Sequence, residues 1–580
     1  MNNGPVVLGI HDGHNSSACL MAGGRVLAAV SEERISRMKN ECGYPARAVE
    51  CVMKQAGISG RDLDGVALAS RFMHHREFFY NWEWYRKGAQ DQVEDASREP
   101  QRRQYLLGKR QQERVDEIVH HVGCSADKIT IQEHHSGHAS AAYYASGWAF
   151  GGEKVLVLTL DGSGDGVCGT VSIGENGAIR RLAQTGSAAS LGKIYSRLTF
   201  LMGMKPWEHE YKLMGLAPYA DPRGQAKSYD VLSKLVVLDE GSLTFRTGTD
   251  LSTNYCYPYL RTNLENHRFD WIAGAAQQLV EERVVQWVRT ALAATSTTKV
   301  VCGGGVFMNV KVNMLISELP EVEAVFTFPS CGDESLCFGS AYAETVRLAE
   351  LRGGASGFDG LDSAYLGPSF DDADVEAALQ AHPRKFHVVK HPSVDTALGN
   401  LLAKKYIVAR INGRMEWGAR ALGNRSILMD PRHTRGVREL NAAIKQRDFW
   451  MPFAPSVLES SQSDFIENPK NLKSPFMMTA FRTTPEGEPG LAAATHPYDG
   501  TARAQLVDSV MNPGYHRLIS RFRERTGVGA VLNTSLNIHG EPIVCTPSEG
   551  LSTLERSSLP VMAIGDYLIS KQPVAGEASD

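Results

Sequence analysis

Several features that mark specialised protein classes are absent from this chain of 580 residues. Its ten cysteines include no C-x-x-C pair, which argues against a zinc ribbon and favours reduced thiols. No apolar run reaches the roughly 18 residues that a membrane-spanning helix needs, and the first residues lack the pattern of a signal peptide. A net charge of −4 gives no general attraction to nucleic acid or anionic membranes. We therefore expect a cytoplasmic enzyme with no nucleic-acid or membrane partner.

The chain is too long for one hydrophobic core, so two or three domains are expected. Residues 351–369 are rich in Gly, Ser and Asp, a composition typical of a linker. The sequence thus predicts one domain over residues 1–360 and another over 370–580.

One stretch, residues 133–166, combines several features of a site. His134 and His138 are four residues apart on an alanine-rich segment, so on a helix they would share a face and reach one cation. A predicted buried strand over residues 154–160 then leads to Asp161 and the glycine-rich loop GSGDG. This order predicts a metal beside a phosphate site, although such histidine pairs also occur on surfaces and in cores.

A fourth ligand is offered by a later strand, whose loop presents Asp333 before a helix of small residues. Two imidazoles and two carboxylates suit Fe, Mn or Zn better than Ca.

The first thirty residues and those from 155 onward share one order of elements. Each begins with a predicted strand, continues through an Asp-Gly loop (Asp12-Gly13 and Asp161-Gly162), and ends in a hairpin. This order indicates an internal duplication. A duplicated unit of this kind is the layout of the actin, hexokinase and heat-shock ATPase superfamily, in which these loops hold nucleotide phosphates.

A third anion-binding element is predicted at Gly303, Gly304 and Gly305, between a strand and a helix. Glycines there allow backbone N–H groups to approach an anion closely, although a simple strand-to-helix turn is the alternative.

The second predicted domain is marked by arginines among glycines: Arg414, Arg420 and Arg425, then Arg447 with Lys445, then Arg503. Asn533, Ser535 and Asn537 follow in a turn after a strand. Because the arginine fork matches phosphate and carboxylate oxygens, these clusters predict a small-anion site. Scattered surface arginines are the alternative.

At this point the motifs carry a resemblance. The chain resembles the O-carbamoyltransferases of antibiotic and nodulation-factor biosynthesis over nearly its whole length. The matching motifs are HNSSA (14–18), SEERISRMKN (31–40), HHSGH (134–138), LDGSGDG (160–166), EYKLMGLAPY (210–219), GGGVFMN (303–309), CGDE (331–334), MEWGARALGNRSIL (415–428), PFAPSVL (452–458), DGTARAQ (499–505) and NTSLNIHGEPIV (533–544).

The resemblance implies an α/β fold with an actin/hexokinase-like N-terminal domain and a YrdC-like C-terminal domain. It implies that the C-terminal domain converts carbamoyl phosphate and ATP to carbamoyl adenylate, from which the N-terminal domain carbamoylates a hydroxyl of a small-molecule natural product. Fe(II), or another divalent metal, is implied on the four ligands named above, with Mg²⁺ as a further candidate cofactor.

The resemblance also implies roles for individual residues. His14 matches the histidine suggested as general base, and Lys39 is a second catalytic candidate. The predicted nucleotide-binding residues are Gly162, Gly164, Asp165, Lys212, Gly303, Gly304, Gly305 and Asn309. The predicted carbamoyl phosphate ligands are Arg420, Lys445, Arg447, Arg503, Asn533 and Ser535.

One position departs from the family. Relatives usually carry an arginine before the Pro-Phe-Ala-Pro motif, where this chain has Met451. Either a neighbour such as Arg447 compensates, or the chain lacks an ion contact worth about 1.5–3 kcal/mol.

Three other functions fit parts of the pattern: tRNA threonylcarbamoylation, carbamoylation of a protein thiol, and nucleotide-dependent regulation without catalysis. The charge argues against tRNA, and the zinc-finger cysteine pairs of the thiol-modifying family are missing. The acceptor stays open, and so does the oligomeric state, with a homodimer as one outcome. We expect the acceptor to be selected by residues 70–115, which are equally compatible with a solvated helical excursion, and by the loops around 185–210 and 250–265. Aromatic candidates there are Trp207, Tyr255, Tyr257 and Tyr259.

Overall fold

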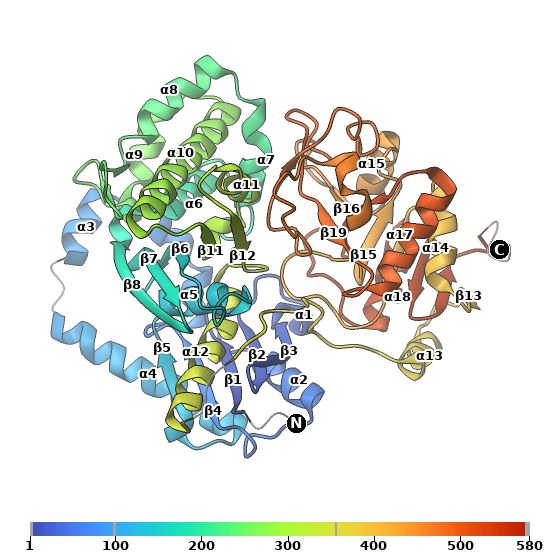
Figure 1. Cartoon of the computed structure of the whole chain (residues 1–580), viewed down its shortest axis with the longest axis horizontal. Coiled ribbons are helices and arrows are strands. Elements are labelled where there is room, and N and C mark those ends of the chain that lie inside the picture. The colour runs from blue at the N-terminus through green and yellow to red at the C-terminus, as the bar shows by residue number, and fades with distance from the viewer. Residues whose placement is uncertain (1–3, 97–99, 354–356, 575–580) are drawn as a thin grey trace. The chain divides into compact units, whose positions relative to one another are not determined.

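The computed structural model describes residues 4–96, 100–353 and 357–574, and the chain forms two compact units (Figure 1). Met1–Glu32 and Asn40–Leu361 make up the first unit. Glu33–Lys39 and Asp362–Asp580 make up the second. Residues 97–99 of the predicted acceptor insertion and 354–356 of the predicted linker lie outside the described residues. The second unit thus contains a short segment from near the N-terminus, which the sequence did not predict.

The first unit contains two five-stranded sheets with the same topology. In the first sheet the strand order is β3-β2-β1-β4-β5, and in the second it is β8-β7-β6-β11-β12. In both, the first strand pairs antiparallel with the next strand and parallel with the strand on its other side. Their strands are β1 (Val6–His11), β2 (Ser17–Ala22), β3 (Arg25–Ser31), β4 (Gly65–Ala69), β5 (Ile129–Gln132), β6 (Val155–Gly164), β7 (Val167–Glu175), β8 (Ala178–Gly186), β11 (Lys299–Gly303) and β12 (Ala324–Thr327). The predicted duplication and the actin/hexokinase-like fold class are therefore confirmed.

Helices connect and cover these sheets (Figure 1). They are α2 (Ala46–Ala56), α3 (Ala89–Ala96), α4 (Pro100–Val122), α5 (His134–Ala145), α6 (Leu191–Leu201), α7 (Glu210–Leu216), α8 (Pro222–Leu232), α9 (Tyr257–Asn263), α10 (Phe269–Thr295), α11 (Val310–Glu318) and α12 (Leu336–Leu351). A small hairpin of β9 (Val236–Leu238) and β10 (Phe245–Thr247) lies between α8 and α9 in the sequence. Two helices, α5 and α12, pack so closely that a Cβ on Gly339 would lie 1.8 Å from the carbonyl oxygen of Gly137. This contact fixes α5 against the start of α12.

Strand β6 is longer than the sequence predicted. It continues past Leu160 to Gly164, with an irregular register between those two residues, and Gly164 pairs with Val167. The turn between them is Asp165-Gly166, whose φ angles of 50° and 84° are those of a two-residue hairpin turn. The glycine content suggested a loop, but the Asp-Gly pair was the stronger local signal.

The second unit is also α/β. Its main sheet has the order β13-β22-β21-β14-β15-β20-β16-β19. The strands are β13 (His387–Lys390), β14 (Val408–Ile411), β15 (Arg425–Met429), β16 (Ala454–Leu458), β19 (Gln505–Val507), β20 (Ala530–Ser535), β21 (Val561–Ile564) and β22 (Tyr567–Ser570), beside a small pair of β17 (Phe481–Arg482) and β18 (Thr501–Ala502). The helices are α1 (Glu33–Ser36), α13 (Asp372–Ala381), α14 (Val394–Ala403), α15 (Thr434–Leu440), α16 (Gln462–Phe465), α17 (Pro513–Thr526) and α18 (Pro547–Arg556).

This sheet is buried on both faces. Val408 and Ala409 are neighbours on β14, yet they belong to different hydrophobic clusters, because successive side chains point to opposite faces. Leu551 of α18 joins the cluster of Ala409, whereas Leu398 of α14 and Leu518 of α17 join that of Val408. The α/β class predicted for this region is therefore confirmed.

Candidate functional site

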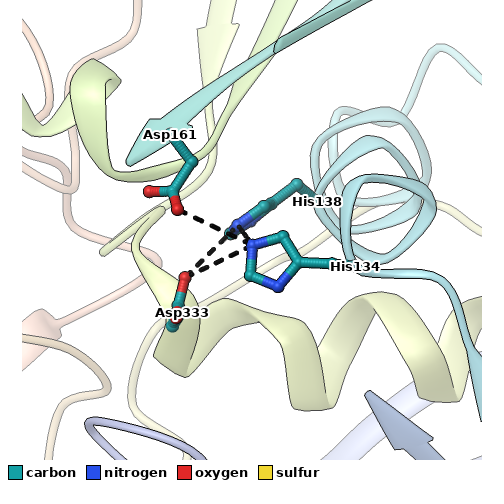
Figure 2. A group of neighbouring side chains, drawn as sticks. All are labelled: His134, His138, Asp161 and Asp333. Atoms are coloured by element: carbon teal, nitrogen blue, oxygen red, sulfur yellow. Dashed lines mark hydrogen bonds and ion pairs between the residues drawn. The ribbon is translucent and has the colours of Figure 1, made fainter. Parts of the chain in front are cut away.

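Four side chains predicted as metal ligands converge in the first unit (Figure 2). His134 and His138 lie one turn apart on α5, Asp161 lies near the end of β6, and Asp333 precedes α12. One potential ligand atom from each residue lies within 4.8 Å of those of the others. The cluster is thus formed by the helix pair α5 and α12 and by the second sheet.

The orientation of the two imidazoles suits a shared cation. The Nε2 atoms of His134 and His138 are 3.1 Å apart, and both are about equally far from Asp333 Oδ1, at 3.6 and 3.5 Å. The opposite ring nitrogens contact hydroxyls: Nδ1 of His134 lies 2.9 Å from Ser70 Oγ, and Nδ1 of His138 lies 3.3 Å from Ser335 Oγ. Hydrogen bonds of this kind orient histidine ligands in metal sites. The donor set therefore fits a divalent transition metal.

Electrostatic interactions in the cluster are strong. Burial alone would lower the pKa of His134, but Asp333, Asp161 and Asp165 raise it to about 9. Burial alone would raise the pKa of Asp161, but the hydrogen bond from His134 and the nearby histidines lower it well below its usual range. The carboxylates thus hold a positive charge between them, which a proton on His134 or a metal ion can supply.

Glycines make room for these ligands. A Cβ on Gly164 would lie 2.0 Å from the ring of His134, and one on Gly303 would lie 2.6 Å from the carbonyl oxygen of His138. The backbone N–H of Gly305 donates to Asp161 Oδ1 at 2.9 Å, which fixes that carboxylate. These three glycines were predicted to contact nucleotide. They also shape the group of four candidate metal ligands, which we call the metal cluster.

Other predicted nucleotide-binding residues have structural contacts. The carboxylate of Asp165 accepts hydrogen bonds from the backbone N–H groups of Arg71, Phe72 and His134. Asn309 caps α11 by accepting from Val312 N. Their predicted contacts with nucleotide remain predictions.

The remaining three nucleotide-binding candidates differ in their surroundings. Gly304 is crowded, since a Cβ there would lie 2.5 Å from the carbonyl oxygen of Leu160. No atom lies within 4 Å of the position that a Cβ on Gly162 would take, so a ligand can approach its backbone. Lys212 is half-buried on α7.

The general-base candidate, His14, lies beside an aromatic cluster. Its ring centroid is 5.1 Å from that of Trp207, one of the predicted acceptor-selecting residues. His11 was missed by the sequence analysis: it is fully buried, and Asp333 and His134 both influence its charge. Burial lowers the pKa of His11 to about 4, so this ring is neutral. Its signal in the sequence was its place at the end of β1, three residues before His14.

A second group of charged residues lies in the second unit. Burial and the charges of Arg420 and Arg447 lower the pKa of Arg503 well below its usual range. Burial and the charges of Arg447 and Lys39 do the same to the pKa of Lys445. We call these five residues the cation cluster. Burial of neighbouring like charges favours an anion among them.

Lys445 is held in place from the turn after β20. Its Nζ donates to Ser535 Oγ at 3.1 Å and to Asn537 Oδ1 at 2.7 Å. Asn533, by contrast, donates from Nδ2 to the carbonyl of Ala421 and to Ser456 Oγ, so it connects β20 to its surroundings.

Three residues have positions that the sequence did not indicate. Lys39 was predicted as a catalytic residue together with His14, but it belongs to the second unit and His14 to the first. Arg425 is fully buried, and its guanidinium donates to five backbone carbonyls, including those of Cys545 and Asn412. Arg414 likewise donates to carbonyls of the segment before α13. Arg414 and Arg425 therefore stabilise the fold.

Arg447 lies close to the motif that follows Met451, the position where relatives usually carry an arginine. Arg447 donates to the carbonyl of Pro452 at 3.3 Å and to Thr534 Oγ1 at 3.0 Å, and its guanidinium lies 4.7 Å from the ring of Phe453. Arg447 is therefore anchored beside the Pro-Phe-Ala-Pro motif, within the cation cluster.

No helix in the described ranges is long and apolar enough to cross a membrane.

Comparison with known proteins finds relatives in sequence and in structure. Nodulation protein NolNO of Sinorhizobium fredii is 30% identical over 574 residues, covering 97% of this chain and 80% of that protein. The 3'-hydroxymethylcephem-O-carbamoyltransferase of Amycolatopsis lactamdurans is 33% identical over 265 residues, 45% of this chain and 47% of that protein. Among solved structures, T. kodakarensis HypF is 11% identical in sequence, with a TM-score of 0.33. The alignment covers 60% of this chain and 48% of the HypF chain.

Family models cover most of the chain. Residues 6–342 match the model described as carbamoyltransferase N-terminus, and residues 399–571 match the model described as carbamoyltransferase C-terminus. The chain therefore belongs to the carbamoyltransferase family of enzymes.

Proposed function

We propose that this protein is an ATP-dependent O-carbamoyltransferase that acts on a hydroxyl of a small molecule. The observation that carries the proposal is the cation cluster of the second unit, which would bind carbamoyl phosphate. A tRNA-modifying enzyme or a non-catalytic regulator gives no reason for such a cluster. The relative named for carbamoylation of 3'-hydroxymethylcephem supports a small-molecule acceptor.

The first half-reaction is proposed for the second unit. Arg503, Arg447 and Arg420 bind the phosphate oxygens of carbamoyl phosphate, because guanidinium groups match them in geometry and charge. Water releases the phosphate, the resulting carbamate oxygen bonds to the α-phosphorus of ATP, and pyrophosphate leaves. The product is carbamoyl adenylate, in which AMP is a good leaving group.

The second half-reaction is proposed for the first unit. The acceptor hydroxyl attacks the carbamoyl carbon, AMP leaves, and His14 takes the hydroxyl proton. Nucleotide phosphates approach the backbone of Gly162 and the Gly303–Gly305 turn. A divalent metal on His134, His138, Asp161 and Asp333 would act as a Lewis acid toward the nucleotide phosphate.

A direct test combines the purified protein with ATP, carbamoyl phosphate and a panel of hydroxylated natural products. We expect one acceptor to gain a carbamoyl group by mass spectrometry, with AMP and pyrophosphate released in equal amounts. AMP and pyrophosphate without a product would show that the acceptor is missing from the panel. Absence of nucleotide turnover in metal-loaded protein would contradict the proposal, and carbamoylation of tRNA or of a protein thiol would replace it.

A further inference from the structure

An aromatic cluster surrounds Trp207 in the first unit. Its ring lies 5.1 to 6.0 Å, between centroids, from five others: His14, Phe79, Trp82, Trp84 and Tyr85. Trp207 itself has a φ of 63°, an uncommon conformation for a bulky residue. The segment that contributes most of the rings, residues 76–86, lies within the predicted acceptor insertion. The cluster thus extends from the general-base candidate into this segment.

Two cations lie against these rings. The guanidinium carbon of Arg197 is 4.9 Å from the ring centroid of Trp84 and 4.3 Å from that of Tyr85, and Lys193 Nζ is 5.4 Å from that of Trp84. Both residues come from α6, one turn apart.

The hydrogen bonding of Arg197 is incomplete. Its side chain is fully buried, and Nη2 donates to the carbonyl of Asn254 at 2.8 Å. Within the described part of the chain, however, Arg197 Nε and Nη1 and Trp84 Nε1 are buried without hydrogen-bond partners. Buried polar groups are nearly always satisfied, so these three N–H groups point to an acceptor of hydrogen bonds that the chain does not supply.

No carboxylate balances the charge of Arg197. Among the described residues, no ion pair within 4.0 Å joins an acidic side chain to Arg197 or Lys193. Glu210 accepts a hydrogen bond from the backbone N–H of Trp207 at 2.7 Å. Burial and the charge of Arg197 lower the pKa of Lys193 to about 8, although Asp161 acts in the opposite direction. A negatively charged ligand would satisfy both the hydrogen bonds and the charge.

This group of residues borders the metal cluster. Ser190, which caps α6, donates to the carbonyl oxygens of Asp161 and Gly162, and it also accepts from Lys193 N. The start of α6 therefore lies beside Asp161 and Gly162. Both cations contact Trp84, whose ring lies 5.6 Å from that of Trp207, and the ring of Trp207 lies 5.1 Å from that of His14. An acceptor bound here would have its hydroxyl near the reacting groups.

We infer that the acceptor is a hydroxylated acid: Arg197 and Lys193 bind its carboxylate, and the rings of Trp84 and Trp207 contact a planar or apolar body. The inference rests on the proposed carbamoyl transfer, because it assigns the acceptor class of that reaction. If the inference is correct, cationic and neutral alcohols are poorer acceptors for this enzyme than hydroxylated acids.

The test uses the full chain and two probes, 4-(hydroxymethyl)benzoate and its methyl ester, which share the aromatic alcohol but differ in charge and by one methyl group. Isothermal titration calorimetry measures binding to the native protein and to Arg197→Met, Lys193→Met and Arg180→Met. We expect the acid to bind about tenfold more tightly than the ester, since the ester loses a charge-assisted contact. Arg197→Met and Lys193→Met should remove or reduce this difference. Arg180, which is exposed on β8, is the matched control and should leave it unchanged.

Several outcomes would overturn the inference. Equal binding of acid and ester, or no binding of either, would do so, as would an unchanged preference in both α6 variants. A loss of AMP formation in Arg197→Met would show that the cations bind nucleotide instead. If the enzyme carbamoylates neutral alcohols but no hydroxylated acid, the inferred acceptor class is wrong, although the carbamoyltransferase function stands. Binding of the acid by protein that forms no AMP from ATP and carbamoyl phosphate would keep the binding site and reject the proposed function.

Discussion

At the scale of single residues, the cation cluster is expected to bind carbamoyl phosphate and, because its like charges are buried together, to destabilise the folded protein. Arg503 is held next to Arg420 and Arg447, and burial and these charges disfavour its protonated form. Replacing it by Met should therefore prevent use of carbamoyl phosphate while raising the free energy of unfolding by about 1 kcal/mol, because functional sites commonly reduce stability. AMP formation with carbamoyl phosphate and ATP measures the first effect, and urea denaturation measures the second.

The matched control is Arg435→Met, at an exposed arginine of the same unit. It should leave both quantities unchanged within about 0.5 kcal/mol, as is usual for surface positions. The Arg503 variant should still transfer the carbamoyl group from supplied carbamoyl adenylate. Loss of that activity, or a marked loss of stability, would mean that Arg503 supports the fold rather than the first half-reaction.

Ser70 offers a test of the metal cluster that leaves all four ligands intact. Its hydroxyl lies 2.9 Å from Nδ1 of His134, so it orients the ring with Nε2 toward His138 and Asp333. Ser70→Ala should weaken metal affinity by about 10- to 100-fold, the usual effect of removing such a partner. Metal titration against a competing chelator measures this change. Ser36→Ala, in the second unit, is the control; equal affinities in the two variants would remove Ser70 from the site.

At the scale of elements, the turn after β11 depends on a glycine. Gly304 has a φ of 98°, and a Cβ there would lie 2.5 Å from the carbonyl oxygen of Leu160 on β6. Gly304→Ala should therefore destabilise the protein by about 1–2 kcal/mol for the backbone conformation and by more for the clash. Because Asp161 follows Leu160 directly, bound metal should fall as well.

The control for Gly304 is a glycine that also has a positive φ but is not crowded. Gly166 has a φ of 84°, and no atom lies within 4 Å of its Cβ position. Gly166→Ala should cost about 1–2 kcal/mol for its left-handed backbone conformation and nothing for a clash. Thermal unfolding and metal content of both variants separate the two effects. Equal losses would show that the approach to Leu160 is unimportant.

The elements show how much of this molecule its sequence predicts. The helix that carries His134 and His138, the duplicated hairpins and the turn at Gly303–Gly305 follow from local periodicity, spacing and glycine content. The end of β6 at Gly164 was predicted incorrectly, because two local signals competed there. The pairing of Ser70 with His134 and the aromatic cluster around Trp207 join residues that are distant in the sequence. No local pattern specifies such contacts.

At the scale of the whole molecule, the two units are connected more than once. The chain leaves the first unit after Glu32, returns at Asn40, and leaves again after Leu361. Within the second unit, Arg37 from the short segment donates to the carbonyls of Ile543 and Pro542 and forms an ion pair with Glu549 at 3.2 Å. The segment is therefore an integral part of the second unit.

This arrangement separates two roles for Lys39. The pKa of Lys445 is lowered by burial, by Arg447 and by Lys39, so Lys39 lies close enough to the cation cluster to act in the first half-reaction. The motif resemblance instead grouped Lys39 with His14 in transfer. Lys39→Met should lower AMP formation from carbamoyl phosphate and ATP by about tenfold, through the loss of one cation from the cluster. Transfer from supplied carbamoyl adenylate should be unchanged. The exposed Lys385→Met serves as the control and should affect neither step. The reverse result, normal AMP formation with impaired transfer, would assign Lys39 to the reaction of the first unit.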